Sequence, residues 1–131
     1  MKHLFLVLAT FVYTGMFAQD NYKTTLEKQL NQEYQNCLDY SNDMLGCVYK
    51  YQKKWDEVLN KYYKLLMSVL SEQGKATLRN TQRQWLSDRK IKYMQIENDA
   101  KYDLNYGGTE SELSTENEKL EITKKKSLTA L

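Results

Sequence analysis

Two short patterns of polar and aromatic residues carry the side chains of this chain that could do chemistry, and they lie about fifteen positions apart. The first pattern has an acid, an amide and a tyrosine at helical spacing: Asp56, Leu59, Asn60 and Tyr63. The second is rich in arginine: Leu78, Arg79, Gln82, Arg83, Trp85 and Arg89. On a helix, Leu78, Trp85 and Arg89 fall within a narrow arc, with Gln82 at its edge. An arginine and an amide therefore share a stripe with a tryptophan.

Such a stripe has two interpretations. In the first, the polar groups form a seam between two helices, which is stable only when its members are paired. We assign five residues to this polar seam: Asp56, Asn60, Tyr63, Gln82 and Arg89. In the second, the surface holds a partner, and arginine and aromatic side chains dominate binding hot spots. The candidate partner-binding residues are then Arg79, Arg83, Trp85, Gly107 and Gly108. The first two of these lie farther from the stripe, so we expect them to be exposed.

The N-terminus predicts export. A short basic start is followed by a nearly unbroken apolar run over residues 4–12 and by a small residue, Ala18. This layout is typical of a secretory signal peptide over residues 1–18, with cleavage before Gln19. A membrane anchor is the alternative, but the apolar run is shorter than the about 20 residues that span a bilayer. We therefore expect one soluble domain over residues 19–131, in the periplasm or secreted.

Composition then excludes several classes of function. The only histidine, His3, leaves with the signal peptide, so the mature chain lacks the usual general base and the commonest metal ligand. Loss of Lys2 reduces the basic side chains from 19 to 18, against 17 acidic ones. This even balance gives no field that would attract a nucleic acid. We expect no cofactor and no metal.

An enzyme would have to work without histidine. It could use two carboxylates from Asp56, Asp88 and Glu97, as glycosidases do. Nothing in the spacing places two of them on opposite walls of a cleft. The sequence therefore favours a protein that acts by binding and not by catalysis.

The two cysteines, Cys37 and Cys47, predict a structural disulfide, because an even count in a short exported domain is typical of one. A redox pair or two metal-binding thiols are the alternatives, although a redox pair more often has the spacing C-x-x-C. A loop of this size would stabilise the fold by about 2–3 kcal/mol.

The chain that positions these residues is helical throughout. The mature part has no proline, almost no glycine before residue 107 and mostly helix-forming residues. We expect helices over about 19–39, 43–70, 75–105 and 114–131. Ser41 to Asp43 and Ser71 supply the breaks and the N-caps. The predicted fold is an all-α bundle of three to four helices with one disulfide.

The short join at residues 71–74 makes the second and third helices a long central antiparallel hairpin. In that register Asp56 faces Arg89, and Tyr63 faces the residues around Gln82. We predict an ion pair between Asp56 and Arg89, and a hydrogen bond from the Tyr63 hydroxyl to the opposite helix.

The last segment predicts a further short helix with few apolar positions. Thr115 and Glu118 have the spacing of a capping box. The lysine triplet at 124–126 is typical of a solvated face near a helix C-terminus. We expect no membrane or nucleic-acid contact from it.

The order of these features resembles one bacterial family. The chain has two cysteines separated by nine residues, then D-x-x-L-N-x-x-Y, then L-R-x-x-Q-R-x-W-x-x-x-R, a double glycine and a terminal helix. This order is similar to the family named after the N-terminal domain of the lysozyme inhibitor LprI. Every fixed position of the two central motifs matches, and the resemblance extends from about Cys37 onward. Members often carry two further cysteines; here Tyr93 stands at the first place, and no cysteine follows it.

The resemblance implies a small exported helical domain that inhibits lysozyme by binding. Its implied partner is a protein, a lysozyme-like muramidase. Known lysozyme inhibitors tend to present acidic or polar groups to a basic enzyme, and we find no obvious acidic concentration in this nearly neutral chain. A structural envelope protein with an unknown partner is the alternative, and a small envelope enzyme is the least favoured.

Overall fold

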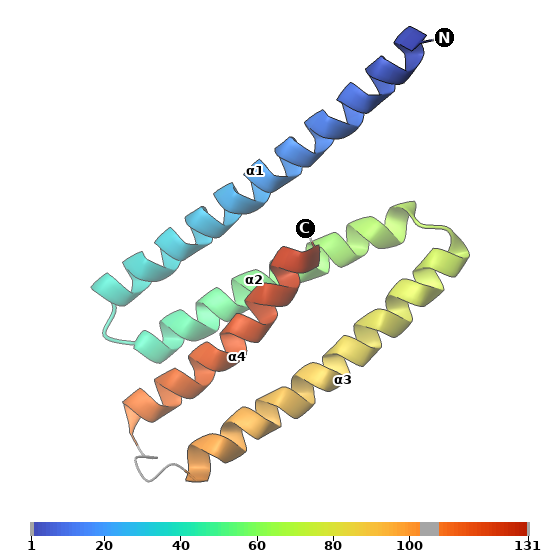
Figure 1. The fold of residues 1–131 in the computed structure, drawn as a ribbon. Helices are drawn as coiled ribbons and strands as arrows, with labels where there is room; N and C mark the ends of the chain where they lie inside the picture. Colours follow the sequence, from blue (N-terminus) through green and yellow to red (C-terminus); the bar gives the residue numbers. More distant parts are fainter. Residues whose placement is uncertain (1, 103–107, 131) are drawn as a thin grey trace.

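The computed structural model describes the backbone of residues 2–102 and 108–130, and the side chains from residue 21 within those ranges. It contains four helices, and no strand occurs in these ranges (Figure 1). They are α1 (Lys2–Tyr40), α2 (Met44–Val69), α3 (Glu72–Tyr102) and α4 (Thr109–Ala130). The predicted all-α class is confirmed. None of the described helices combines the length and apolar character that a membrane span requires.

The predicted N-caps of the two hairpin helices are confirmed in atomic detail, although α3 begins at Glu72 and not at about Lys75. At α2, the Asp43 carboxylate accepts a hydrogen bond from the backbone N–H of Gly46 at 2.8 Å. A side chain at Gly46 would collide with that carboxylate, so the glycine makes room for the cap. At α3, the Ser71 hydroxyl accepts from the N–H of Gly74 at 3.3 Å. These caps satisfy backbone donors that have no partner within a helix.

The predicted start of the last helix is wrong. α4 begins at Thr109, directly after Gly108, whose φ of 109° is a backbone conformation that favours glycine. Thr115 therefore lies inside the helix and donates to the carbonyl of Ser111 at 2.8 Å, so it forms no capping box. The turn, and not the Thr–Glu spacing, decides where α4 begins.

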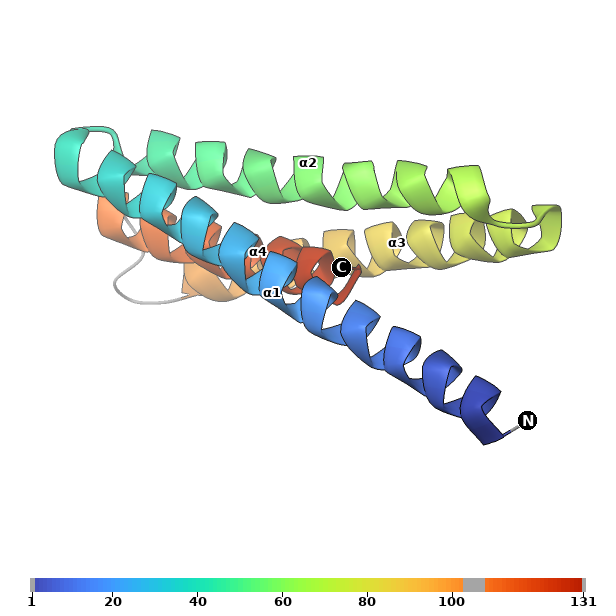
Figure 2. The same ribbon diagram turned by 90° about the horizontal axis from the view of Figure 1, so that it is seen from above.

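The four helices pack with α2 along one side and α1, α4 and α3 along the other (Figure 2). α2 and α3 run antiparallel, as predicted, and join through the short turn after Val69 (Figure 1). The hydrophobic core joins α1, α2 and α4: Leu30, Val48, Tyr51, Trp55 and Leu120. α3 contributes no buried residue to it.

The terminal helix is thus a central element, although its sequence has few apolar positions. Leu120 is 2 % exposed, and Thr123 and Ser127 on the same face are fully buried. Their small size allows α4 to approach α2 closely, and the Ser127 hydroxyl donates to the backbone carbonyl of Trp55 at 2.9 Å. Trp55 itself is fully buried, and α4 packs against it.

The predicted disulfide between Cys37 and Cys47 is confirmed. Their Cα atoms are 5.7 Å apart, and the bond ties the last turn of α1 to the first turn of α2. Cys47 is 1 % exposed. The bond therefore lies at the edge of the core and acts as a structural crosslink.

Candidate functional site

The two sequence motifs line one open cleft between α2 and α3, which we call the motif cleft. Its volume is about 550 Å³. α2 contributes Asp56, Leu59, Asn60 and Tyr63. α3 contributes Arg79, Gln82, Arg83, Trp85, Leu86 and Arg89. The antiparallel hairpin brings these side chains together because helical spacing places each motif on one face of its helix.

Two residues that line this cleft form an ion pair between α2 and α3. Arg89 Nη1 donates to Asp56 Oδ1 at 2.9 Å, which confirms the predicted pair and the register of the hairpin. The Arg89 side chain is 21 % exposed and that of Asp56 is 38 % exposed. Both members of this pair are therefore half-buried, but the rest of the polar seam does not form as predicted: Asn60 is exposed, and neither Asn60 nor Gln82 has a hydrogen bond in the described part of the chain. The predicted hydrogen bond from the Tyr63 hydroxyl to α3 is wrong: that side chain lines the cleft without a partner in the described part of the chain.

The seam continues onto α4 through residues that the motifs do not include. Arg89 also approaches the Thr123 hydroxyl at 3.4 Å. The Tyr93 hydroxyl lies 2.8 Å from that hydroxyl, donates to the carbonyl of Lys119 at 3.0 Å and accepts from Gln52 at 3.1 Å. Tyr93 follows Arg89 by one helical turn, so the helical spacing could have predicted that Tyr93 lies on the same face of α3 as the motif residues. α3, which has no buried residue, is held to α2 and α4 by these polar contacts.

Two cations contact the ring of Trp85. The Arg89 guanidinium lies 4.6 Å from the centre of its ring, and Lys126 Nζ lies 5.7 Å from it. Such contacts are attractive because the face of the indole ring is electron-rich. Trp85 is half-buried, and its side chain both contacts these two cations and lines the motif cleft.

Arg79 and Arg83 are the two uncompensated charges of the motif cleft. Both are exposed, as predicted, and neither has a hydrogen bond or an ion pair in the described part of the chain. The single carboxylate in the lining, Asp56, is already paired with Arg89. The cleft therefore has a net positive charge beside an aromatic ring, which suits binding of a carboxylate or another anionic group.

The remaining candidate partner-binding residues lie elsewhere. Gly107 lies outside the described residues, and Gly108 lines a separate cleft at the far end of α3 with Glu97, Glu112 and Glu116. The structure thus gathers carboxylates at one end of the molecule, an acidic concentration that the sequence analysis missed. A second cleft there contains Asp99, Glu110 and Glu118. We call this region the acidic end.

Lys119 is the buried cation of the acidic end. Its Nζ lies 2.7 Å from a carboxylate oxygen of Glu97 and 2.7 Å from one of Glu116. Burial lowers the pKa of Lys119, but the hydrogen bonds and negative charges of Glu116 and Glu97 together outweigh it and raise the pKa above its ordinary value. The hydrogen bond from Lys119 also lowers the pKa of Glu97. The contact with Glu97 joins the end of α3 to α4.

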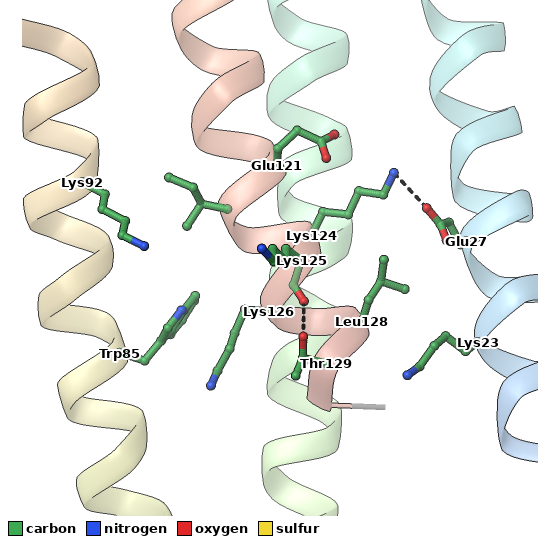
Figure 3. A pocket seen from close by; sticks show the side chains of 11 residues that line it. Lys23, Glu27, Trp85, Lys92, Glu121, Lys124, Lys125, Lys126, Leu128 and Thr129 are labelled. Carbon is green, nitrogen blue, oxygen red and sulfur yellow. Dashed lines mark hydrogen bonds and ion pairs between the residues drawn. The ribbon is translucent and has the colours of Figure 1, made fainter. Parts of the chain in front are cut away.

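A larger, open cleft of about 980 Å³ crosses the face of α4 between α3 and α1 (Figure 3). We call it the lysine cleft, after the five lysines in its lining: Lys23, Lys92, Lys124, Lys125 and Lys126. The expectation that the triplet 124–126 forms one solvated face is wrong. Lys124 is half-buried and pairs with Glu27 at 3.0 Å, and Lys126 contacts the Trp85 ring, so only Lys125 is exposed.

Comparison with known proteins agrees with the resemblance of the two motifs. The sequence model of one family, described as "Lysozyme inhibitor LprI", matches residues 39–128. This range contains both motifs, and it begins two residues after Cys37. No curated protein matches the chain. No solved structure matches it either.

Proposed function

Because the chain belongs to the lysozyme inhibitor LprI family, we propose that it is an exported binding protein that inhibits a lysozyme-like muramidase. The predicted signal peptide supports export to the periplasm or the medium. The observation that carries the proposal is the motif cleft: the polar and aromatic side chains of both family motifs line one open concavity, and two arginines in it have no partner among the described residues.

Arg79, Arg83 and Trp85 are the contact residues in this proposal. Each guanidinium offers a planar set of donors that fits a carboxylate, and the indole adds a large apolar surface. Trp85 is already held by Arg89 and Lys126, so little side-chain freedom is lost when a partner binds. A preorganised aromatic residue beside free arginines has the composition of a binding hot spot.

The alternative is a structural envelope protein in which the motifs only stabilise the hairpin. The pair between Asp56 and Arg89 is explained equally well by that role. The exposed, unpaired Arg79 and Arg83 are not, because they stabilise nothing in the described part of the chain. We therefore favour binding. Catalysis has no comparable support, since neither Asp88 nor Glu97 lines the motif cleft.

The test measures lysis of bacterial cell walls by lysozyme in the presence of the mature protein, from Gln19 onward. We expect a saturable decrease in lysis rate. The variant Arg79→Ala/Arg83→Ala should inhibit at least about tenfold less well, since hot-spot residues contribute about 2 kcal/mol or more. Lys50→Ala/Lys53→Ala is the matched control, because both lysines are exposed and lie outside the motif cleft.

Two results would contradict this proposal. Unchanged lysis at a large molar excess of the wild-type protein would remove the inhibitor function. Equal inhibition by the arginine variant and the wild type would remove the motif cleft as the contact site. In that second case, a loss of inhibition in Glu110→Gln/Glu112→Gln would place the contact at the acidic end.

A further inference from the structure

The lysine cleft collects positive charge from three helices. Lys23 belongs to α1, Lys92 to α3 and Lys125 to α4, so only the tertiary structure brings them to one concavity. In Figure 3, the ammonium groups of Lys92 and Lys126 lie in the space between α3 and α4, and that of Lys23 lies on the opposite side of α4. The charges are thus spread along the cleft and are not gathered at one point.

Most of this charge has no internal partner. Lys124 is neutralised by Glu27, and Lys126 is held over the Trp85 ring. Lys23, Lys92 and Lys125 have neither an ion pair nor a hydrogen bond in the described part of the chain. Glu121 is the one lining carboxylate besides Glu27. Like charges collected in a concave surface repel one another, and a bound anion relieves that repulsion.

The chemistry of the lining favours phosphate over carboxylate. No arginine lines this cleft, although the motif cleft next to it has three. Lysine acts as a point charge and does not match the plane of a carboxylate, but it binds the tetrahedrally arranged oxygens of a phosphate group well. Separated ammonium groups require a ligand with several phosphate groups. Ile122, Leu128 and Trp85 add apolar surface for the uncharged part of the ligand.

We propose that the lysine cleft, formed by Lys23, Lys92 and Lys125 across the face of α4, is a binding site for a ligand that carries several phosphate groups. A phosphate-containing polymer and the headgroups of an anionic phospholipid surface share this chemistry. The site is separate from the motif cleft and shares only Trp85 with it. It would add a second attachment for a protein that binds an enzyme through the adjacent motif cleft.

The experiment measures binding of sodium tripolyphosphate to the mature protein by titration calorimetry, and binding of vesicles that contain phosphatidylglycerol by co-sedimentation. The key variant is Lys23→Gln/Lys92→Gln/Lys125→Gln, which leaves the paired Lys124 and Lys126 in place. Lys50→Gln/Lys53→Gln/Lys64→Gln is the matched control, because it removes the same charge from exposed positions outside the cleft. Citrate, a tricarboxylate, tests the preference for phosphate.

We expect the cleft variant to bind about tenfold more weakly, from roughly a twofold loss for each of the three charges removed. The control variant should change affinity by less than about twofold. Trp85 emission should change on binding in the wild type, whereas Trp55 is fully buried and reports little. Tripolyphosphate binding without vesicle binding would identify a soluble or polymeric phosphate as the ligand, and vesicle binding alone would identify a lipid headgroup.

Three outcomes would overturn the proposal: no binding of either phosphate source by the wild type, equal losses in the two triple variants, or citrate binding as tight as that of tripolyphosphate. Cell-wall lysis should respond to the cleft variant as it does to the wild type. Failure of the phosphate site is therefore distinguishable from failure of muramidase inhibition.

Discussion

Replacement of Arg89 by glutamine would remove one of the contacts that hold α3 to α2 and α4. α3 has no buried residue, so side-chain contacts on its half-buried face must hold it in place. Arg89 makes two of these, with Asp56 at 2.9 Å and Thr123 at 3.4 Å, and it also lies 4.6 Å from the centre of the Trp85 ring on its own helix. The glutamine variant keeps a similar length but loses the charge.

The expected loss follows from the exposure of the two partners. A fully buried pair that loses one member costs about 3–5 kcal/mol, whereas an exposed pair contributes about 0–1 kcal/mol. Arg89 and Asp56 are 21 % and 38 % exposed, so solvent screens the charge that is left and we assign about 1 kcal/mol. The contact with Trp85 adds about 0.5–1 kcal/mol. The free energy of unfolding should therefore fall by about 2 kcal/mol, out of about 5–15 kcal/mol for a typical domain.

The assay is urea unfolding followed by far-ultraviolet circular dichroism. It compares the wild type, Arg89→Gln, Asp56→Asn and the double variant, and the cycle should give a coupling energy of about 1 kcal/mol between the two residues. Lys90→Ala, at the exposed neighbouring position, should stay within about 0.5 kcal/mol of the wild type. If Arg89→Gln is as stable as the wild type, or if the coupling energy is zero, the polar seam does not hold α3.

Three further predictions concern the core, the disulfide and pH. Leu120→Ala should lower the free energy of unfolding by about 3 kcal/mol, because Leu120 is 2 % exposed. Leu65→Ala, at a position 56 % exposed, should lower it by less than about 1 kcal/mol. Equal losses in urea unfolding would contradict a core to which α4 contributes. Removal of the disulfide by Cys37→Ala/Cys47→Ala should cost about 2.7 kcal/mol for a sequence separation of 10, which unchanged urea midpoints would refute. The hydrogen bond and charge of Lys119 lower the pKa of Glu97 below its ordinary 4.5. The Glu97 carboxylate therefore contributes to stability above pH 4.5, and this contribution is lost as the pH falls through the lowered pKa. The difference in stability between wild type and Glu97→Gln should therefore shrink on acidification, and a difference that is constant from pH 7 to pH 3 would contradict this ion pair.

Several features could be predicted from the sequence because they depend on neighbours along the chain. The caps at Asp43 and Ser71 act within three residues. The disulfide closes a short loop, and the register that pairs Asp56 with Arg89 follows from one tight turn. Local chemistry and short connections leave few alternatives at these places.

The place of α4 could not be predicted in the same way. Its apolar positions are few, and the side chains that pack against α2 include Thr123 and Ser127, which are usually exposed. They are buried here because their hydroxyls find partners on Tyr93 and on the Trp55 carbonyl, and because small side chains let two helices approach. Burial of this kind depends on a surface supplied by residues about 70 positions away along the chain.

The candidate binding surfaces also differ in how far the sequence alone could predict them. Helical spacing alone was enough to put each motif on one face of its helix, and the family match over residues 39–128 is a property of sequence. Only the folded hairpin forms a cleft between those faces, in which two arginines have no partner in the part of the chain that the structure describes. The lysine cleft and the acidic end depend wholly on the tertiary structure, because a charge that looks solvated in sequence acquires its neighbours when helices distant along the chain pack together.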